Sequence, residues 1–232
     1  MEEIRVDKKL APCFLYIPRK PGIGASIMKT FLTFSPVAIL LLALALALGC
    51  GGGQRFGARV DSSALDAVNR NEVYYDISGS TVQELRAQME RRGPVYGGKR
   101  MFGRCLWRVR ASFAAYPRKP DARCVASKVP ARLDATITLP RWRGYDQAPA
   151  ELKARWDGFI KGLRRHEQNH FNHGQAAAVE TKRAIQELSG KYDCQEFQRR
   201  AQDILRSVPA AYSDRDREYD SVTNHGSTEF SL

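Results

Sequence analysis

The sequence is poor in proline, in acidic relative to basic residues, and in long hydrophobic runs. Its 232 residues include 11 prolines, too few for a collagen-like repeat, and 25 acidic against 37 basic residues, which excludes a disordered acidic tail. After residue 48 no uncharged stretch is long enough to cross a bilayer, so a polytopic membrane protein is excluded. The length allows one well-packed domain with an appendage.

The basic excess lies mainly in the body of the chain. Residues 1–49 hold six basic and three acidic side chains, so +9 of the formal net charge of +12 belongs to the rest. Between Arg86 and Arg132 the basic residues alternate with apolar and aromatic ones instead of forming one block. This distribution indicates a solvated basic surface, and we expect no specific nucleic-acid partner.

The N-terminal part resembles a bacterial lipoprotein signal. An uncharged run, Phe31–Leu48, follows Lys29 and leads into Gly49-Cys50 and three further glycines. In such signals the cysteine becomes the lipidated first residue of the mature protein, so we expect Cys50 to carry the lipid anchor.

This interpretation predicts three parts: an export signal over 1–49, a flexible tether over 50–61, and a folded domain over 62–232. Translation from Met28 would give a signal of ordinary length. The alternative is an uncleaved membrane anchor. Both alternatives place the domain outside the cytoplasm, on the periplasmic side of the bacterial envelope.

Three cysteines remain for the domain in this oxidising compartment. Cys105 lies in an alternating apolar run, where a free thiol is tolerated as a small hydrophobic group. Cys124 and Cys194 lie near the ends of segments, and we expect them to form a disulfide.

The order of apolar patterns predicts an α+β domain with a small mixed or antiparallel sheet. Pro140 is expected to end a strand, Gly174 to kink the long helix, and Pro209 to close the last helix. The expected strands lie at residues 72–77, 105–113 and 133–139, with a shorter one near Val125, and the expected helices at about 81–92, 150–188 and 196–205.

The apolar stripe of the long helix leads directly into His166-Glu167-Gln168-Asn169-His170. Histidines four residues apart on a helix project about 40° apart, so both can reach one metal ion, and the intervening glutamate can activate water there. This HExxH pattern is typical of zinc metalloproteases, and Zn²⁺ is the expected cofactor. The alternative is a solvated face of histidine and glutamate.

A catalytic zinc ion needs a third protein ligand, which the pattern does not identify. His173 lies too far along a straight helix from His166 to share its ion, unless the helix breaks. In the gluzincin group of zinc proteases a glutamate on the following helix is the third ligand, but Glu180 and Glu196 do not lie in the extended motif of that group. His225 remains, in a segment that by itself indicates a polar tail.

Together these motifs resemble a family of bacterial predicted secreted zinc-dependent proteases that has long been classed as a domain of unknown function. The resemblance extends over most of the domain. It rests on five segments: Tyr74–Thr81 with Glu84-Leu85, Leu139–Trp142, Arg155-Trp156, His166–His170, and Tyr219-Asp220 with Thr223–Gly226.

The resemblance implies a zincin-like metallopeptidase fold, in which a small sheet packs on the long helix. It further implies that His166 and His170 bind the metal, that Glu167 is the catalytic base, and that His225 is the third ligand.

Two neighbours of His225 are candidates by residue type alone. Asp220 is expected to orient a ligand histidine, and Tyr219 to donate a hydrogen bond to an oxyanion. The alternative for both is an exposed position in the tail. The role of His173 stays open.

We therefore expect an exported, membrane-anchored zinc metallopeptidase that acts on proteins or peptides of the cell envelope as a monomer. The alternatives are a hydrolase of peptidoglycan peptide or amide bonds, and a non-catalytic zinc-binding envelope lipoprotein.

Overall fold

A computed structural model describes residues 62–119 and 122–232. The expected signal, the tether and Cys50 lie outside these residues. The elements are, in chain order, the short 3-10 helix η1 Ser62–Ala64, β1 Ala67–Ile77, α2 Val82–Arg92, β2 Val95–Tyr96, β3 Lys99–Arg100, β4 Arg104–Ala111, β5 Ala114–Arg118, β6 Arg123–Lys128, β7 Ala131–Trp142, α3 Ala150–Gln186 and α4 Cys194–Thr223.

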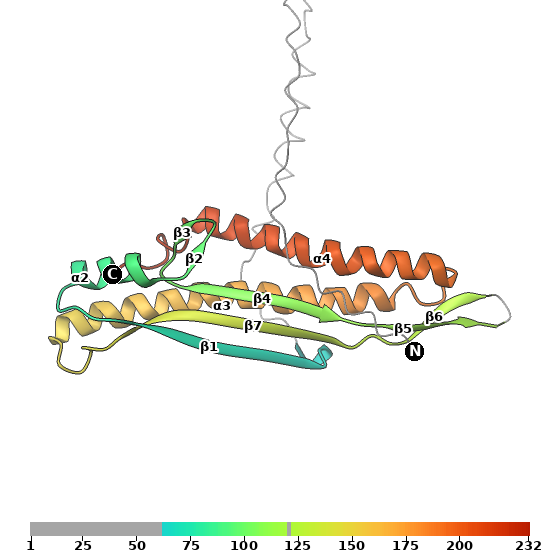
Figure 1. Ribbon diagram of the computed structural model, residues 1–232, viewed down its shortest axis with the longest axis horizontal. Helices are drawn as coiled ribbons and strands as arrows, with labels where there is room; N and C mark the ends of the chain where they lie inside the picture. The colour runs from blue at the N-terminus through green and yellow to red at the C-terminus, as the bar shows by residue number, and fades with distance from the viewer. Residues whose placement is uncertain (1–61, 120–121) are drawn as a thin grey trace, which may run out of the picture. The chain divides into compact units, whose positions relative to one another are not determined.

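The main sheet is mixed and has the order β1-β7-β4 (Figure 1). β7 pairs in parallel with β1 and antiparallel with β4, which leaves β4 with one strand neighbour. β7 continues through Pro140 to Trp142, so the expectation that Pro140 ends this strand is wrong. Pairing with β4 stops at Thr138, so the missing N–H of Pro140 interrupts no bond on that side.

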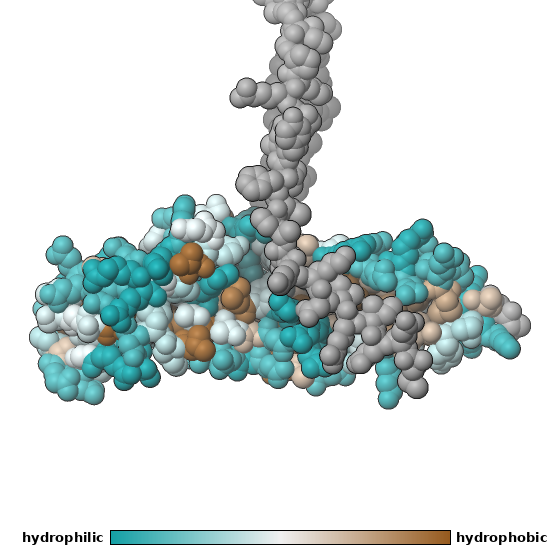
Figure 2. All heavy atoms as spheres, viewed as in Figure 1, coloured by the Kyte–Doolittle hydropathy of each residue, from teal (hydrophilic) through white to brown (hydrophobic). Residues whose placement is uncertain are grey.

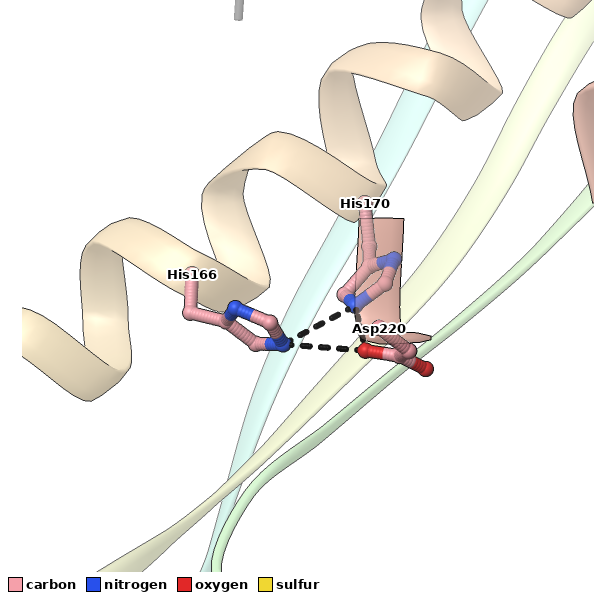
Figure 3. Close-up of side chains that lie close together, drawn as sticks. All are labelled: His166, His170 and Asp220. Carbon is pink, nitrogen blue, oxygen red and sulfur yellow. Dashed lines mark hydrogen bonds and ion pairs between the residues drawn. The ribbon is translucent and has the colours of Figure 1, made fainter. Parts of the chain in front are cut away.

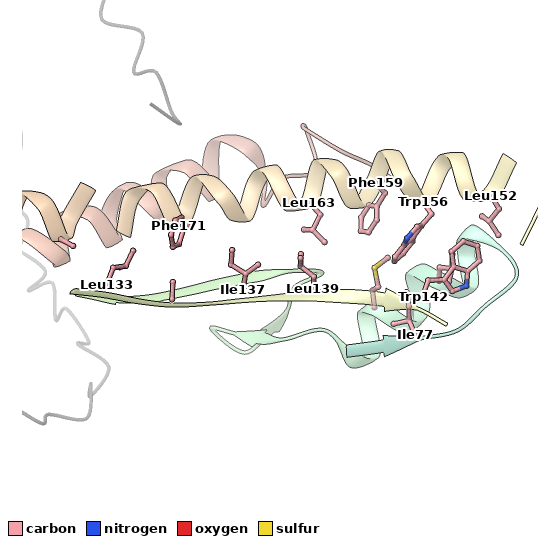
Figure 4. Packing of buried hydrophobic residues seen from close by; sticks show 14 residues of the cluster. Ile77, Leu133, Ile137, Leu139, Trp142, Leu152, Trp156, Phe159, Leu163 and Phe171 are labelled. Atoms are coloured by element: carbon pink, nitrogen blue, oxygen red, sulfur yellow. The ribbon is translucent and has the colours of Figure 1, made fainter. Parts of the chain in front are cut away.

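α3 lies across one face of this sheet and buries its apolar stripe there (Figure 4). Alternate residues of β7, from Leu133 to Leu139, face this stripe. Each fully buried leucine or phenylalanine contributes about 1.5–3 kcal/mol, so this core holds the long helix rigidly on the sheet. The α3 residues labelled in this core are Leu152, Trp156, Phe159, Leu163 and Phe171.

Gly174 does not interrupt α3, because the helix continues through it to Gln186. A Cβ atom at Gly174 would lie 2.7 Å from the Cγ of Trp107, a residue of β4. The glycine therefore permits the close approach of β4 to α3.

α4 is much longer than the sequence predicts, because it continues through Pro209 to Thr223. It runs antiparallel to α3, since Tyr212 bonds to Glu180 while Asp220, further along α4, bonds to His170 on an earlier turn of α3. The residues expected to form a polar tail are thus packed against the centre of α3.

A second apolar cluster joins the C-terminal end of α3 and the N-terminal end of α4 to the hairpin of β5 and β6. Cys124 and Cys194 form a disulfide within it, and Cys105 is free.

The described residues together form an α+β structure with three small sheets. None of the helices in the described residues is both long and apolar enough to span a membrane.

Candidate metal centre

The expected motif residues lie at the middle of α3, on the buried side of the helix. His166, Glu167 and His170 expose only 3%, 3% and 7% of their surface. Leu163 lies one turn before Glu167 and Phe171 one turn after it, and both anchor the same face of the helix in the core. A rigid scaffold thus holds both imidazoles one turn apart.

Asp220 of α4 completes a triangle of ligand atoms with the two histidines (Figure 3). Its Oδ1 lies 3.1 Å from Nε2 of His166 and 3.0 Å from Nε2 of His170. The two Nε2 atoms are 3.2 Å apart. All three side chains therefore converge on one point.

These distances fit a metal ion. Ligands at about 2.0–2.2 Å from a tetrahedral ion stand roughly 3.3 Å from one another. The observed separations are close to that value, and two nitrogens and one carboxylate oxygen form a donor set that Zn²⁺ accepts. The three side chains can hold a metal ion, although the geometry does not identify the element.

Each histidine also contacts a carboxylate through its other ring nitrogen. Nδ1 of His166 lies 2.8 Å from Oε2 of Glu229, and Nδ1 of His170 lies 2.9 Å from Oδ1 of Asp216. Because an ionised carboxylate only accepts hydrogen bonds, Nδ1 carries the proton in both rings. When the ring is neutral, this leaves the Nε2 lone pair directed at the triangle, as in metal-binding histidines.

The charges within the cluster are strongly coupled. Burial opposes protonation of His170, but hydrogen bonds to Asp216 and Asp220 outweigh it and raise its pKa to about 10. Burial likewise opposes ionisation of Asp220, but hydrogen bonds from the two histidines lower its pKa well below the usual range. A metal ion must displace the proton from Nε2 of a protonated histidine before it can bind there, so metal binding weakens as the pH falls.

Glu167 lies beside the triangle, against the start of β4. Burial raises its pKa to about 7, while the charged histidines and the backbone N–H of Cys105 favour the ionised form. A Cβ atom at Gly103 would lie 2.7 Å from Oε1 of Glu167. Glycine at that position therefore makes room for the carboxylate.

Tyr219 packs on the metal-binding face but does not point into it. Its ring stacks on His166, with the ring centres 4.8 Å apart. Its hydroxyl donates to Glu229 and accepts a bond of 2.7 Å from Asn169. Tyr219 thus orients the Glu229 carboxylate behind His166, and these contacts offer no support for an oxyanion role.

His225 is not part of the triangle of ligand atoms in the described residues, and its role as the third ligand stays a prediction. Its side chain is 46% exposed, and its Nδ1 lies 3.7 Å from Oδ2 of Asp220, the carboxylate oxygen that faces away from the histidines. The continuation of α4 to Thr223 places Asp220 at that corner instead. Asp220 contacts both histidines directly, which fits an orienting role as well as a place in the ligand set.

His173 joins the outer carboxylate on α4. Its Nδ1 lies 2.6 Å from Oδ1 of Asp216, which also contacts His170. Trp107 donates to the other oxygen, Oδ2, at 2.6 Å. Asp216 thereby links three side chains from two elements, and together with His170 and His173 it forms a second group of ligand atoms that could hold a metal ion.

Sequence reasoning missed two functional carboxylates, Asp216 and Glu229. Asp216 lies four residues before Asp220, so recognition of a helix through Pro209 would have placed both on one face. Glu229 follows the end of α4, and no local pattern marks it.

A cleft of about 560 Å³ opens over the centre, and both histidines and Glu167 line it. The residues of β4 from Arg104 to Trp107 form one wall, and Phe230 contributes to another. The buried triangle is therefore accessible from outside.

Residues 72–226 match a family described as "Bacterial protein of unknown function (DUF922)". The match includes the helical motif, Asp216 and Asp220 but ends before Glu229. No curated protein and no solved structure matches the chain.

We predict that Asp220→Ala lowers the affinity for Zn²⁺ by more than about 100-fold, because it removes a group that binds the metal and not only a hydrogen-bond partner of such a group. His225→Ala should bind zinc as tightly as the wild type. Competition with a chromophoric chelator measures both affinities, and circular dichroism confirms that each variant is folded. Loss of zinc in His225→Ala together with retention in Asp220→Ala would contradict the triangle.

We predict that Glu229→Gln weakens zinc binding by about 10- to 100-fold, because the amide keeps the shape of the side chain but not the charge that orients His166. Glu218→Gln, an exposed change on α4, is the matched control. The same titration applies, and wild-type affinity in Glu229→Gln would show that this carboxylate does not support the centre.

Proposed function

The chain belongs to this DUF922 family, and we propose that it is a zinc-dependent hydrolase that cleaves peptide bonds. The observation that carries the proposal is the convergence of His166, His170 and Asp220 beside the buried Glu167. Three protein ligands leave a coordination position open, as catalytic zinc sites do, whereas structural sites are closed by four.

We further propose that the domain is zincin-like. A long helix carries two histidines and a glutamate on its buried face, and it packs across a small mixed sheet. The third ligand comes from a later helix, which is compatible with that arrangement.

Bound zinc would supply the Lewis acidity that lets water attack a carbonyl group near neutral pH. His166 and His170 present Nε2, and Asp220 presents Oδ1, to hold the ion. The carboxylate of Glu167 takes the proton from the attacking water and then delivers it to the leaving amine. Burial suits this role, because a pKa of about 7 makes Glu167 a stronger base than an exposed carboxylate while its protonated form can still give the proton to the amine.

The edge strand β4 supports a peptide as the substrate. Within the described residues, β4 pairs with β7 only, and its first residues line the cleft. An extended peptide can add to such an edge through main-chain hydrogen bonds. The peptide would then pass beside Glu167, because Cys105 of β4 bonds to Glu167 through its backbone.

The same chemistry also suits the alternative of a peptidoglycan hydrolase, because peptidoglycan contains short peptides. Release of wall fragments without protein cleavage would favour it. The non-catalytic alternative requires a fourth protein ligand. In the described residues the ligand atoms gather in two groups of three that share His170, one with His166 and Asp220 and one with His173 and Asp216, and neither group has a fourth member.

We propose that the domain works outside the cytoplasm, held to a membrane by a lipid on Cys50. The disulfide between Cys124 and Cys194 supports an oxidising compartment. The apolar run before Cys50 supports export.

We predict that Glu167→Gln keeps its zinc but loses peptide cleavage by about 10²- to 10⁴-fold in kcat/KM, because the amide cannot accept the proton. Glu151→Gln, an exposed change on the same helix, should cleave like the wild type. Fluorogenic peptides measure the rates and elemental analysis measures the zinc. Full cleavage by zinc-loaded Glu167→Gln would refute the mechanism.

We predict that Cys50→Ser shifts the protein from the membrane to the soluble envelope fraction, because serine cannot receive the lipid. Fractionation of expressing bacteria, followed by immunoblotting, measures the shift. If the variant stays in the membrane at the wild-type size, the uncleaved anchor is the correct interpretation.

A further inference from the structure

We propose that the cleft selects peptides that carry an acidic side chain next to the cleaved bond. This inference rests on the proposed function and concerns the rim of the same site. Four cationic side chains from α2, β3 and β4 line the cleft together: Arg86, Lys99, Arg100 and Arg104.

None of these four cations forms an ion pair with any residue in the ranges 62–119 and 122–232. Several arginines elsewhere in the described residues do pair with carboxylates, such as Arg141 and Arg143 with Asp76. The fifth basic residue at the cleft, Arg217, pairs with Asp214. The rim therefore keeps a local excess of positive charge.

The three arginines are nevertheless held in place by main-chain oxygens. Nη1 of Arg100 donates to the carbonyl of Gly93 at 2.8 Å, and Nη1 of Arg104 donates to that of Val95 at 2.9 Å. Nη1 of Arg86 donates to the main-chain oxygen of Leu232 at 3.3 Å. A guanidinium group has five N–H donors, so each keeps donors for a ligand without losing its charge.

Aromatic rings further restrict two of these side chains. Arg104 lies over the ring of Tyr96, 4.9 Å from its centre, and Arg86 over that of Phe102 at 5.9 Å. Ordered guanidinium groups lose less entropy on binding a carboxylate than free side chains do. Lys99 adds a mobile charge beside them.

The acidic residues that line the cleft do not neutralise this rim. Asp216 and Asp220 bond to the histidines, and Glu167 is buried below them. The cleft thus has its negative groups at the centre and its positive groups at the edge. A substrate carboxylate would be drawn to the edge, which keeps the reacting bond over the centre.

A carboxylate-bearing peptide fits this cleft better than a membrane surface does. The cations surround a concave site together with the catalytic groups, instead of lying on an open face. On the face in Figure 2, hydrophobic residues form small separate groups within a mainly hydrophilic surface. The part of this face that is coloured in Figure 2 offers no broad apolar patch for insertion into lipid.

The test uses a positional set of internally quenched octapeptides, in which one Glu or one Gln is moved along an otherwise neutral sequence. With the zinc-loaded protein, we expect the best Glu peptide to exceed its Gln partner by about tenfold in kcat/KM at low salt. The ratio should fall several-fold at about 0.5 M salt, because exposed charges are screened. Binding of the same peptides to Glu167→Gln is measured by fluorescence anisotropy.

The double variant Lys99→Gln/Arg104→Gln should lower the Glu-to-Gln ratio by about 3- to 10-fold, and the ratio is the readout because both peptides meet the same altered cleft wall. The matched control Arg118→Gln/Lys161→Gln removes the same charges from exposed positions that do not line the cleft, and should leave the ratio unchanged. A Glu preference that both double variants retain equally would overturn the assignment to this rim.

The remaining outcomes separate the two proposals. Cleavage of all peptides without a Glu preference overturns the acidic selection and leaves the hydrolase. Absence of cleavage with a rim-dependent Glu preference in binding overturns the hydrolase and leaves the selection. Absence of both overturns both. Binding to phosphatidylglycerol vesicles that the rim variant loses, without a peptide preference, would assign the cations to a membrane instead.

Discussion

The structure depends on burying two imidazole rings between helices without leaving a polar nitrogen unsatisfied. A buried polar group without a partner costs about 1–3 kcal/mol, so both nitrogens of His166 and His170 need partners. Glu229 and Asp216 satisfy the outer nitrogens, and Asp220 faces the inner ones. The length of α4 and the path of the chain after it follow from this requirement, because they bring the three carboxylates to α3.

The helical part of the site could be predicted because it is local. Two histidines and a glutamate within five residues share a face wherever the chain forms a helix, and the apolar stripe before them predicts that helix. The sheet was predictable for the same reason, since alternation marks β4 and β7. The pairing of Cys124 with Cys194 also matches the expectation, although spacing alone does not determine it.

Asp216, and the placement of Asp220 beside both histidines, could not be predicted from the sequence because both depend on a helix that contains a proline. Pro209 normally ends a helix, since it removes a backbone hydrogen bond and crowds the preceding turn. Packing of α4 along α3 outweighs that local cost here, as burial on both sides of the proline indicates: Phe197 and Tyr219 are both almost fully buried. Asp216 and Asp220 share a face only when the helix is recognised as continuous.

The segment around His225 has a structural role that explains its composition without metal binding. Asn224, His225 and Gly226 have φ angles of +47°, +53° and +81°, a left-handed turn that ends α4. The N–H of His225 bonds to the carbonyl of Asp220 at 2.7 Å, which caps the helix at the ligand itself. The turn then directs the chain back over His166, where Phe230 packs closely on Gly226 and Glu229 reaches Nδ1. The backbone of His225 thus has a structural role of its own, because the turn it forms brings the Glu229 carboxylate to Nδ1 of His166.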